Sequence, residues 1–392
     1  MEPPAPIHLL RSHSSPITAL YCSEDNRRIY SADSSGLVVV TSALSLRAII
    51  CWKAHTDGVL GVEEWQDNVI THGRDNKLHV WSCIHDSSEL SGPDGSSVRD
   101  LTPKYSMDVN SLNYCRFSML ISSDPNWDHK ISPLAKEAWI ALPNLVESSE
   151  VDIWSLPSCD RLHAAIGKQP NGSSGRGEHG IIMSLHLFRM DSVNVPSNAS
   201  RPLSNLRLLT AYESGHVILR EYLTPERVKS VEGRGWEAIW NVKLHNEAIM
   251  AMRVSRDNSV AITVSADHLL GKYELTSRSS TEVACSAHRT KHPGNSCVAL
   301  RDDGRICAVG GWDGRIRLYS IKSFKPLGTL RYHKDSCQAL EFARTLSEDA
   351  SYSESDEEDD MTEDEKMRRG RWLFGGAKDN RVSIWELITF ER

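Results

Sequence analysis

The chain is built from short apolar runs in which buried and polar positions alternate. Runs such as RIYSA, NVITHG, VAITVSA and WLFGGA have the period of a β-strand with one buried face. A turn of two or three residues follows each run, as in RDN, WDG and KDN, and these are the residues that favour tight hairpins. A second apolar run comes next. The pattern predicts a series of β-hairpins and an all-β fold.

The hairpin recurs seven times when the copies are aligned on the aromatic residue of the second run. In four copies an aspartate precedes the aromatic residue by six positions: Asp75 and Trp81, Asp267 and Tyr273, Asp313 and Tyr319, Asp379 and Trp385. Two weaker copies have an aliphatic residue after Asp33 and Glu213, and a seventh keeps Trp154 but has Ser148 at the acidic position. Repeats of about 40–45 residues with four short strands are typical of propeller blades. The sequence therefore predicts one seven-bladed β-propeller domain over residues 1–392.

A histidine precedes most copies, and it could belong to a catalytic triad or to a structural network. The histidines are His13, His55, His245 and His333, with His288 or His292 in the sixth copy. A His–Ser–Asp set can activate a nucleophile, but a triad is needed once, whereas this set recurs in blade after blade. We expect these groups to satisfy buried polar atoms between strands. We predict no enzymatic activity, no catalytic residue, no cofactor and no metal ligand.

These residues resemble WD repeats, in which a histidine, an aspartate, a serine or threonine two residues before it, and a tryptophan form a hydrogen-bonded tetrad. With that spacing no copy keeps all four members, and Trp-Ser or Trp-Glu stands where Trp-Asp is usual. The resemblance implies tetrad-like structural roles for His13, Ser31, Asp33, His55, Asp75, Trp81, His245, Ser265, Asp267, Asp313, His333, Asp379 and Trp385.

The same resemblance implies that the residue before the tetrad aspartate points onto the narrow face of the ring. Four of these positions hold large side chains, namely Arg74, Tyr212, Trp312 and Lys378. Arg, Tyr and Trp dominate the binding energy of many interfaces. We predict that these four residues form a partner-binding face, with packing over adjacent blades as the alternative.

The two ends of the chain are expected to close the ring together. VSIWELITFER ends just after the third strand of the last copy, and PIHLLR (6–11) has no earlier strand to pair with. We predict that the N-terminal segment supplies the outer strand of the last blade and covers an exposed strand edge.

An acidic run dominates the net charge of −7, because residues 347–365 hold eleven acids and no base, which leaves about +4 for the remainder (−7 + 11). We predict that residues 347–369 are a disordered insertion in the seventh blade. Ser351, Ser353, Ser355 and Thr362 each precede an acid by three residues and are candidates for an acid-directed kinase. The run could contact a basic partner or be a solvated loop. KMRRGR (366–371) could be a nuclear-import patch or a basic flank that balances the acids.

Composition excludes several other classes. The mild charge of the remainder does not indicate direct nucleic-acid binding, and no stretch of about 18 apolar residues predicts a membrane span. The nine cysteines contain no Cys-x-x-Cys pair. We interpret them as buried free thiols in a reducing compartment.

Five phrases carry a closer resemblance: HGRDNKLHVW, AYESGHVILREY, VKLHNEAIMAMRVS, GGWDGRIRLYSIKSFKPLGTLRYHKDSCQALEFA and LFGGAKDNRVSIWEL. They resemble the ASTRA-associated protein family of fungi, whose animal relatives are guanine-nucleotide-binding-protein β-subunit-like proteins. The resemblance spans nearly the whole chain, is most specific around residues 310–342 and is weakest in the third blade.

The resemblance implies a nuclear, non-enzymatic scaffold subunit of the ASTRA assembly, which is linked to chromatin remodelling and to the co-chaperone that matures phosphatidylinositol-3-kinase-related kinases. It implies helical-repeat proteins and ring-shaped ATPases as partners, a monomer within a hetero-complex, and the cytoplasm as a second compartment.

Two alternatives stay open. A G-protein-β-like signalling scaffold would carry a heptad helix before its first blade, where only about twelve residues are available. A ubiquitin-ligase substrate receptor usually has Trp-Asp-x-Arg after a third strand, where this chain has WSCI, WSLP and WELI.

Overall fold

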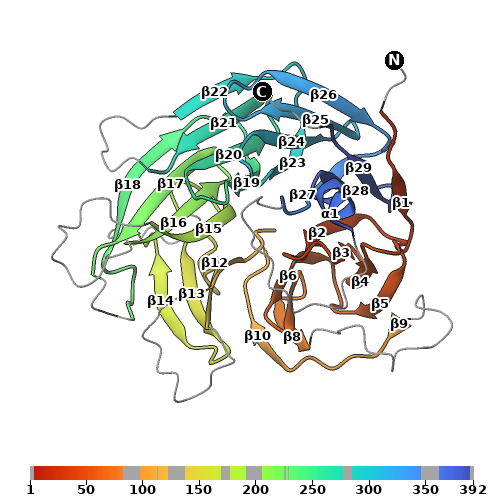
Figure 1. Ribbon diagram of the computed structural model, residues 1–392. Coiled ribbons are helices and arrows are strands. Elements are labelled where there is room, and N and C mark those ends of the chain that lie inside the picture. The colour runs from red at the N-terminus through yellow and green to blue at the C-terminus, as the bar shows by residue number, and fades with distance from the viewer. Residues whose placement is uncertain are drawn as a thin grey trace.

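A computed structural model describes residues 4–82, 98–112, 114–121, 137–168, 177–190, 205–224, 227, 229–276, 285–345 and 362–388 of the chain. Its strands form seven sheets arranged around a central axis, as the blades of a β-propeller (Figure 1). Each sheet begins at the axis with its first strand and ends at the rim. The predicted all-β, seven-bladed propeller is confirmed.

Blades 1 and 2 are irregular in their outer strands, whereas blade 3 is a regular four-stranded sheet. Blade 1 has a fifth, parallel strand, and the third strand of blade 2 pairs with β10 across a long connection. The strands of blade 1 are β2 (Ile17–Cys22), β3 (Arg28–Asp33), β4 (Leu37–Ser42), β5 (Ala48–Lys53) and β9 (Val98–Arg99). Those of blade 2 are β6 (Val59–Trp65), β7 (Asn68–Gly73), β8 (Lys77–Ser82) and β10 (Tyr105–Asp108), and those of blade 3 are β11 (Ser118–Ile121), β12 (Ala138–Pro143), β13 (Val151–Leu156) and β14 (Arg161–Ile166).

Blades 4 to 6 are regular four-stranded meanders. Blade 4 contains β15 (Ile182–Met190), β16 (Asn205–Tyr212), β17 (His216–Tyr222) and β18 (Trp236–Lys243). Blade 5 contains β19 (Ile249–Val254), β20 (Val260–Ser265), β21 (Leu269–Glu274) and β22 (Cys285–Arg289), and blade 6 contains β23 (Asn295–Leu300), β24 (Ile306–Gly311), β25 (Arg315–Ser320) and β26 (Pro326–Arg331).

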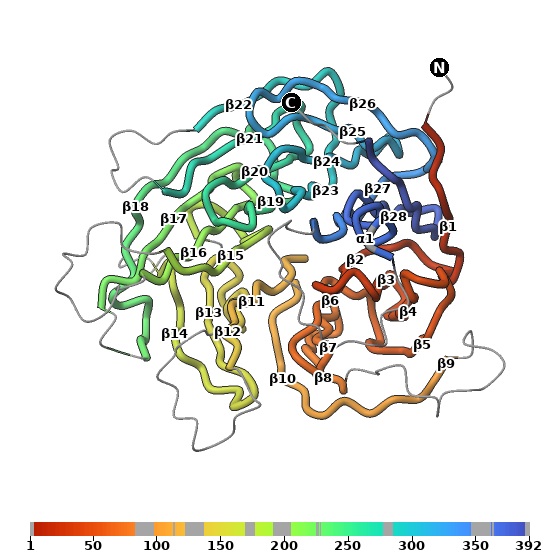
Figure 2. Tube along the Cα trace, viewed as in Figure 1, coloured from red at the N-terminus to blue at the C-terminus, as the bar shows by residue number. Residues whose placement is uncertain are grey.

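Blade 7 is completed by the N-terminus. Its own strands are β27 (Cys337–Phe342), β28 (Trp372–Ala377) and β29 (Val382–Glu386), and β1 (His8–Leu10) pairs antiparallel with β29. Figure 2 shows the two ends of the colour scale side by side at this seam. Leu10 is buried in a cluster with Ile17 of blade 1 and Trp372 and Ile384 of blade 7. The predicted ring closure is confirmed.

A second contact between blades 7 and 1 lies away from β1. The amide of Asn26 accepts a hydrogen bond from the backbone N–H of Arg344 and donates one to its carbonyl, both at 2.8 Å. The Arg344 guanidinium also lies 3.0 Å from the Glu24 carboxylate. The seam therefore combines strand pairing, apolar packing and a polar clasp.

Apolar side chains fill the spaces between neighbouring blades. One cluster joins Ile316 and Leu318 of blade 6 to Phe342 and Trp385 of blade 7. The middle strands are covered on both faces, so every residue of β24 and of β28 is buried. This is why these runs are apolar or small throughout, rather than strictly alternating.

The end of the acidic insertion differs from the prediction. Residues 363–369 form the helix α1 (Glu363–Arg369), so the expectation of disorder up to 369 is wrong there. Thr362 caps the helix, and Arg369 lies 2.6 Å from the Glu365 carboxylate. Arg368 and Arg371 both contact Glu386. These cations are paired within the blade, which favours the balancing flank over an import patch.

Several predicted features lie outside the described residues, namely 347–361 of the acidic run with Ser351, Ser353 and Ser355, and Cys83. All the cysteines that the structure describes are unpaired, and most are buried. No helix within the described ranges is long and apolar enough to cross a membrane.

Candidate functional site

The turn between the second and third strands of each blade lies against the loop that enters the next blade. In these turns Gly36 and Gly314 have φ of 95° and 73°, and a Cβ on Gly36 would lie 2.0 Å from the carbonyl oxygen of His55. Only glycine tolerates both the positive φ and the close approach. The turns and loops of all blades therefore meet at one end of the ring, which we call the narrow face.

Blade 2 contains a complete tetrad. His55 Nδ1 lies 2.9 Å from Asp75, His55 Nε2 lies 2.8 Å from Thr71 Oγ1, and Trp81 Nε1 donates to the same hydroxyl at 2.9 Å. The indole N–H donates to the hydroxyl, the hydroxyl donates to Nε2, and Nδ1–H donates to the carboxylate, so every donor has an acceptor. Thr71 lies four residues before Asp75, so the expectation that no copy keeps all four members is wrong.

Blade 7 contains a second complete tetrad, but its hydroxyl comes from the opposite strand. His333 Nδ1 lies 3.0 Å from Asp379, and both His333 Nε2 and Trp385 Nε1 lie 2.8 Å from Ser383 Oγ. Ser383 on β29 pairs across the ladder with Gly375 on β28. Gly375 is the residue of blade 7 that is equivalent to Thr71 of blade 2. A Cβ on Gly375 would lie 3.0 Å from Ser383 Oγ, so the glycine makes room for the serine.

Blade 5 keeps three members and corrects the assignment of Ser265. His245 Nε2 lies 2.8 Å from Thr263 Oγ1, and His245 Nδ1 lies 3.1 Å from Asp267. Ser265 instead donates to the backbone carbonyl of Ala248. The hydroxyl again lies four residues before the aspartate, because that position faces the histidine.

In blade 1 His13 bonds both Asp33 and Ser31 at 2.8 Å, although the register differs from that of blade 2. Asp33 lies opposite the first residue of β2, and in blade 2 the residue opposite the first residue of β6 is Gly73. Asp33 is thus equivalent to Gly73 and not to Asp75. Asp33 therefore reaches the histidine from the end of its strand, whereas Asp75 lies in the turn. The alignment on the last aromatic residue misplaced this copy by two positions.

Blades 4 and 6 contain an arginine in place of a tetrad member. Asp313 of blade 6 pairs with Arg317 rather than with a histidine, and Arg317 Nη1 and Nη2 lie 3.1 and 2.5 Å from its two carboxylate oxygens. His288 stacks on Phe324 instead. In blade 4 Arg220 occupies the position that tryptophan has in blade 2. Its guanidinium donates a hydrogen bond of 2.8 Å to the hydroxyl of Thr210.

Blade 3 has no tetrad among its described residues, and Ser148 accepts a hydrogen bond from the Asn110 amide at 3.0 Å. Trp154 is half-buried beneath the Arg161 guanidinium. The buried carboxylate of this blade is Asp152, which accepts hydrogen bonds from the Asn144 amide and the backbone of Ala165. The aspartate and histidine of other blades are thus replaced by an aspartate held by amide donors.

The Asp75 carboxylate is tuned by its surroundings. Burial raises its pKa, but hydrogen bonds from His55 and from the backbone of Thr56 outweigh burial and lower the pKa to about 2. A group whose pKa is lower in the folded state binds fewer protons there than in the unfolded chain. Asp75 therefore stabilises the fold above about pH 4, and this contribution is lost as the pH falls towards 2.

We expect Asp75→Asn to cost on the order of 2 kcal/mol at pH 7. The difference from the wild type should shrink between about pH 4 and pH 2, when measured by urea unfolding at each pH. Asp108→Asn is the control on the same blade, because its carboxylate is exposed in a surface ion pair with Lys77. A constant cost of Asp75→Asn across this range would contradict the prediction.

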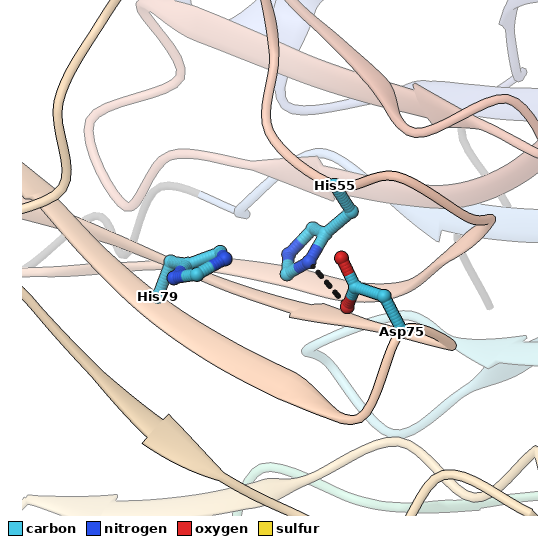
Figure 3. Close-up of side chains that lie close together, drawn as sticks. All are labelled: His55, Asp75 and His79. Carbon is cyan, nitrogen blue, oxygen red and sulfur yellow. Dashed lines mark hydrogen bonds and ion pairs between the residues drawn. The ribbon is translucent and has the colours of Figure 1, made fainter.

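Figure 3 shows a cluster that has the composition of a metal site. Ligand atoms of His55, Asp75 and His79 lie within 4.8 Å of one another, and the two imidazoles stack at 4.7 Å. Both nitrogens of His55 are already engaged by Asp75 and Thr71. Burial and the nearby His55 lower the pKa of His79 to about 4, and its Nδ1 lies 2.6 Å from Ser106 Oγ. A metal would have to break the tetrad, so the cluster is better explained as structure.

The residues predicted to face a partner divide into two groups. Arg74, Trp312 and Lys378 are exposed at equivalent turn positions, where each backbone N–H donates to the residue preceding the first strand of the blade. Tyr212 is buried, and its hydroxyl accepts from Arg220, so its assignment to the surface is wrong. Glu213 occupies the equivalent turn position in blade 4.

Sequence reasoning missed three hydroxyls and one exposed patch. Thr71, Thr263 and Ser383 carry the tetrads, and a threonine within an apolar run was the available signal for the first two. The patch lies at blade 3, where Leu112 and Val146 are exposed on loops joined through Asn110. Arg74 lies over the ring of Tyr114 at 4.2 Å beside it.

Comparisons with known proteins agree with this geometry. The family model described as "WD domain, G-beta repeat" matches residues 4–41 and 284–320. ASTRA-associated protein 1 of Verticillium alfalfae is 30% identical over 412 residues, covering 99% of this chain and 94% of the relative.

Two further relatives extend the similarity. The protein of the same name from Schizosaccharomyces pombe is 29% identical, covering 87% of this chain and 94% of the relative. The guanine nucleotide-binding protein subunit beta-like protein 1 of Mus musculus is 25% identical, covering 98% of this chain and 97% of the relative.

Proposed function

The chain belongs to the family of ASTRA-associated protein 1, and on that premise we propose that it is a non-enzymatic scaffold subunit of an ASTRA assembly in the nucleus. In this role the propeller holds other protein subunits in place, among them helical-repeat proteins of the co-chaperone for phosphatidylinositol-3-kinase-related kinases and ring-shaped ATPases. The assembly acts in chromatin remodelling.

The observation that carries the proposal is the end-to-end similarity to proteins named for association with ASTRA. It covers 99% of this chain and 94% of the relative from Verticillium alfalfae. A relative that matches over nearly its whole length is similar to this chain throughout the ring rather than in one repeat. A rigid ring with seven sets of loops suits the simultaneous binding of several partners.

The chemistry of the tetrads also supports a scaffold. The histidines that bond a tetrad aspartate are engaged on both nitrogens, as His13, His55 and His333 show. A histidine that must accept a proton during a reaction needs a nitrogen that faces the substrate. These side chains instead lie beneath the turns and stabilise them.

Purification of the tagged full-length chain from nuclear extract tests the proposal. We expect helical-repeat subunits and ring-shaped ATPases to co-purify in stoichiometric amounts and to be identified by mass spectrometry. An untagged extract controls for background. Recovery of a ubiquitin-ligase adaptor, or of a small helical γ-type subunit, in place of these proteins would contradict the proposal and favour one of the alternatives.

A further inference from the structure

Trp312 is the most prominent exposed aromatic side chain of blade 6. It lies in the turn between β24 and β25, and 51% of its surface is accessible. Its ring rests on Gly294, where a Cβ would lie 2.6 Å from the indole. The backbone of Trp312 also donates to the Gly294 carbonyl at 2.8 Å. The indole is therefore held in place by backbone on one side and open to solvent on the other.

Adjacent turns and loops extend this surface across blade 7. The Gly314 turn lies against the carbonyls of His333 and Asp335, and the backbone of Lys378 donates to Ser336 in the same loop. Asn380 in turn donates to the carbonyl of Ser14. These contacts make one continuous surface, here called the basic arc, which consists of Lys291, His292, Trp312, Lys334, Lys378 and Arg381.

The charges of the basic arc are not balanced. Lys291, Lys334 and Lys378 are exposed, and their ammonium groups have no hydrogen-bond or ion-pair partner among the described residues. The acids in the same loops are engaged locally. Asp313 pairs with Arg317, and hydrogen bonds from this arginine outweigh burial and lower the Asp313 pKa.

The other two acids are engaged in a similar way. Asp379 pairs with His333, and Asp335 accepts from the backbone N–H of Ser336 at 2.7 Å. The lysines are therefore exposed to solvent, whereas the carboxylates bind donors within blades 6 and 7. Loops of blades 3 and 5 carry the exposed or half-buried acids Glu247 and Glu147 instead of lysines.

We propose that the basic arc binds an acidic segment of a partner protein that places one large apolar side chain against Trp312. The inference rests on the proposed scaffold function and deepens it by naming the chemistry of one partner. Unpaired lysines attract acidic side chains, and a fixed indole between them offers the packing that anchors an interface.

The acidic run of this same chain is a competing occupant. It connects β27 with α1. Because β27 starts at the loop that carries Lys334, the run leaves blade 7 at the opposite end of the strand. We therefore assign the basic arc to a separate chain, and the deletion of residues 347–361 distinguishes the two sources.

The test selects peptides from a random twelve-residue library with the purified full chain. We expect the selected peptides to be rich in Asp and Glu around one large apolar residue. Fluorescence anisotropy then measures their affinity for variants. Trp312→Ala should weaken binding by about 30-fold, as a 2 kcal/mol hot spot does. Lys334→Glu with Lys378→Glu should weaken it at least tenfold and flatten its salt dependence.

Lys322→Glu with Lys325→Glu is the matched control, because these exposed lysines lie between β25 and β26 at the other end of blade 6. Selection of neutral or basic peptides, or equal binding by the arc variants and the control, would overturn the proposal. Tighter binding of a twelve-residue oligothymidine than of the peptides would overturn it in favour of a nucleic acid. A large gain in peptide affinity on deleting residues 347–361 would assign the basic arc to the chain's own segment.

Co-purification with the same variants separates this inference from the proposed function. If the wild type and both arc variants recover the ASTRA subunits equally, the basic arc is not their binding surface, but the scaffold function stands. If the wild type recovers none of them, the scaffold function fails regardless of the arc.

Discussion

Deletion of residues 1–11 is expected to lower the melting temperature by about 5–10 °C and to cause aggregation. The deletion removes β1 from the edge of blade 7, and with it the pairing of His8–Leu10 with β29. It also removes the buried side chain of Leu10, and loss of a buried leucine alone costs about 2–5 kcal/mol. The unpaired N–H and C=O groups of β29 would then template pairing with other chains.

Two variants separate the strand from the residues before it. Deletion of residues 1–5 keeps the hydrogen bond from Ile7 to Ile384 and all of β1, so it should melt like the full chain. Leu10→Ala keeps the strand but loses the apolar contact, so it should show part of the destabilisation. Differential scanning fluorimetry and light scattering measure both effects. If the chain without residues 1–11 melts like the full chain, the apolar packing of Ile17 against blade 7 and the hydrogen bonds between Asn26 and Arg344 hold the two blades together without β1.

The ring and its closure could be predicted because they depend on repetition. Each blade repeats the same turn chemistry, and a ring of antiparallel strands must cover the edge of its last blade. The repeat pattern leaves the last blade one strand short and leaves β1 without a blade of its own, so the two complement each other. Residues 363–369 were mispredicted because the composition of the acidic run was extended into a segment that Thr362 and Arg369 hold as a helix.

The tetrads were predicted only in part because hydrogen bonds depend on proximity rather than on spacing. In blade 2 the hydroxyl comes from Thr71 on the second strand, and in blade 7 it comes from Ser383 on the third. The two positions face each other across the ladder, so either can reach the histidine. A rule based on spacing from the aspartate considers only the second strand, so it does not find a hydroxyl that comes from the third strand.

Alignment errors explain the misplaced surface residue. The copies were aligned on a final aromatic residue, which blades 1 and 4 lack. In blade 4 the alignment is wrong by one position, so the buried Tyr212 was assigned to the turn position that Glu213 occupies. A shift of one residue exchanges a buried for an exposed side chain, because side chains alternate between the two faces of a strand. Arg220 and Arg317 were missed because arginine replaces tryptophan or histidine in those blades.

Ser383→Ala is expected to destabilise the protein by about 2–4 kcal/mol, although it removes a single oxygen atom. Ser383 is fully buried, and its hydroxyl serves two partners at once. Without it the indole N–H of Trp385 and the Nε2 atom of His333 lose their partner. Each buried polar group left without a partner costs about 1–3 kcal/mol.

A double-mutant cycle with Trp385→Phe isolates the shared hydrogen bond. Phenylalanine keeps most of the packing and removes the indole donor, so Ser383→Ala should cost less in that background, by about 1–2 kcal/mol. Trp52→Phe is the matched control, because Trp52 is equally buried in blade 1 and its indole N–H has no partner among the described residues. Urea unfolding of the single and double variants gives both couplings. If Ser383→Ala is as costly beside Trp385→Phe as beside Trp52→Phe, the serine and the indole act independently, and blade 7 does not depend on a connected tetrad.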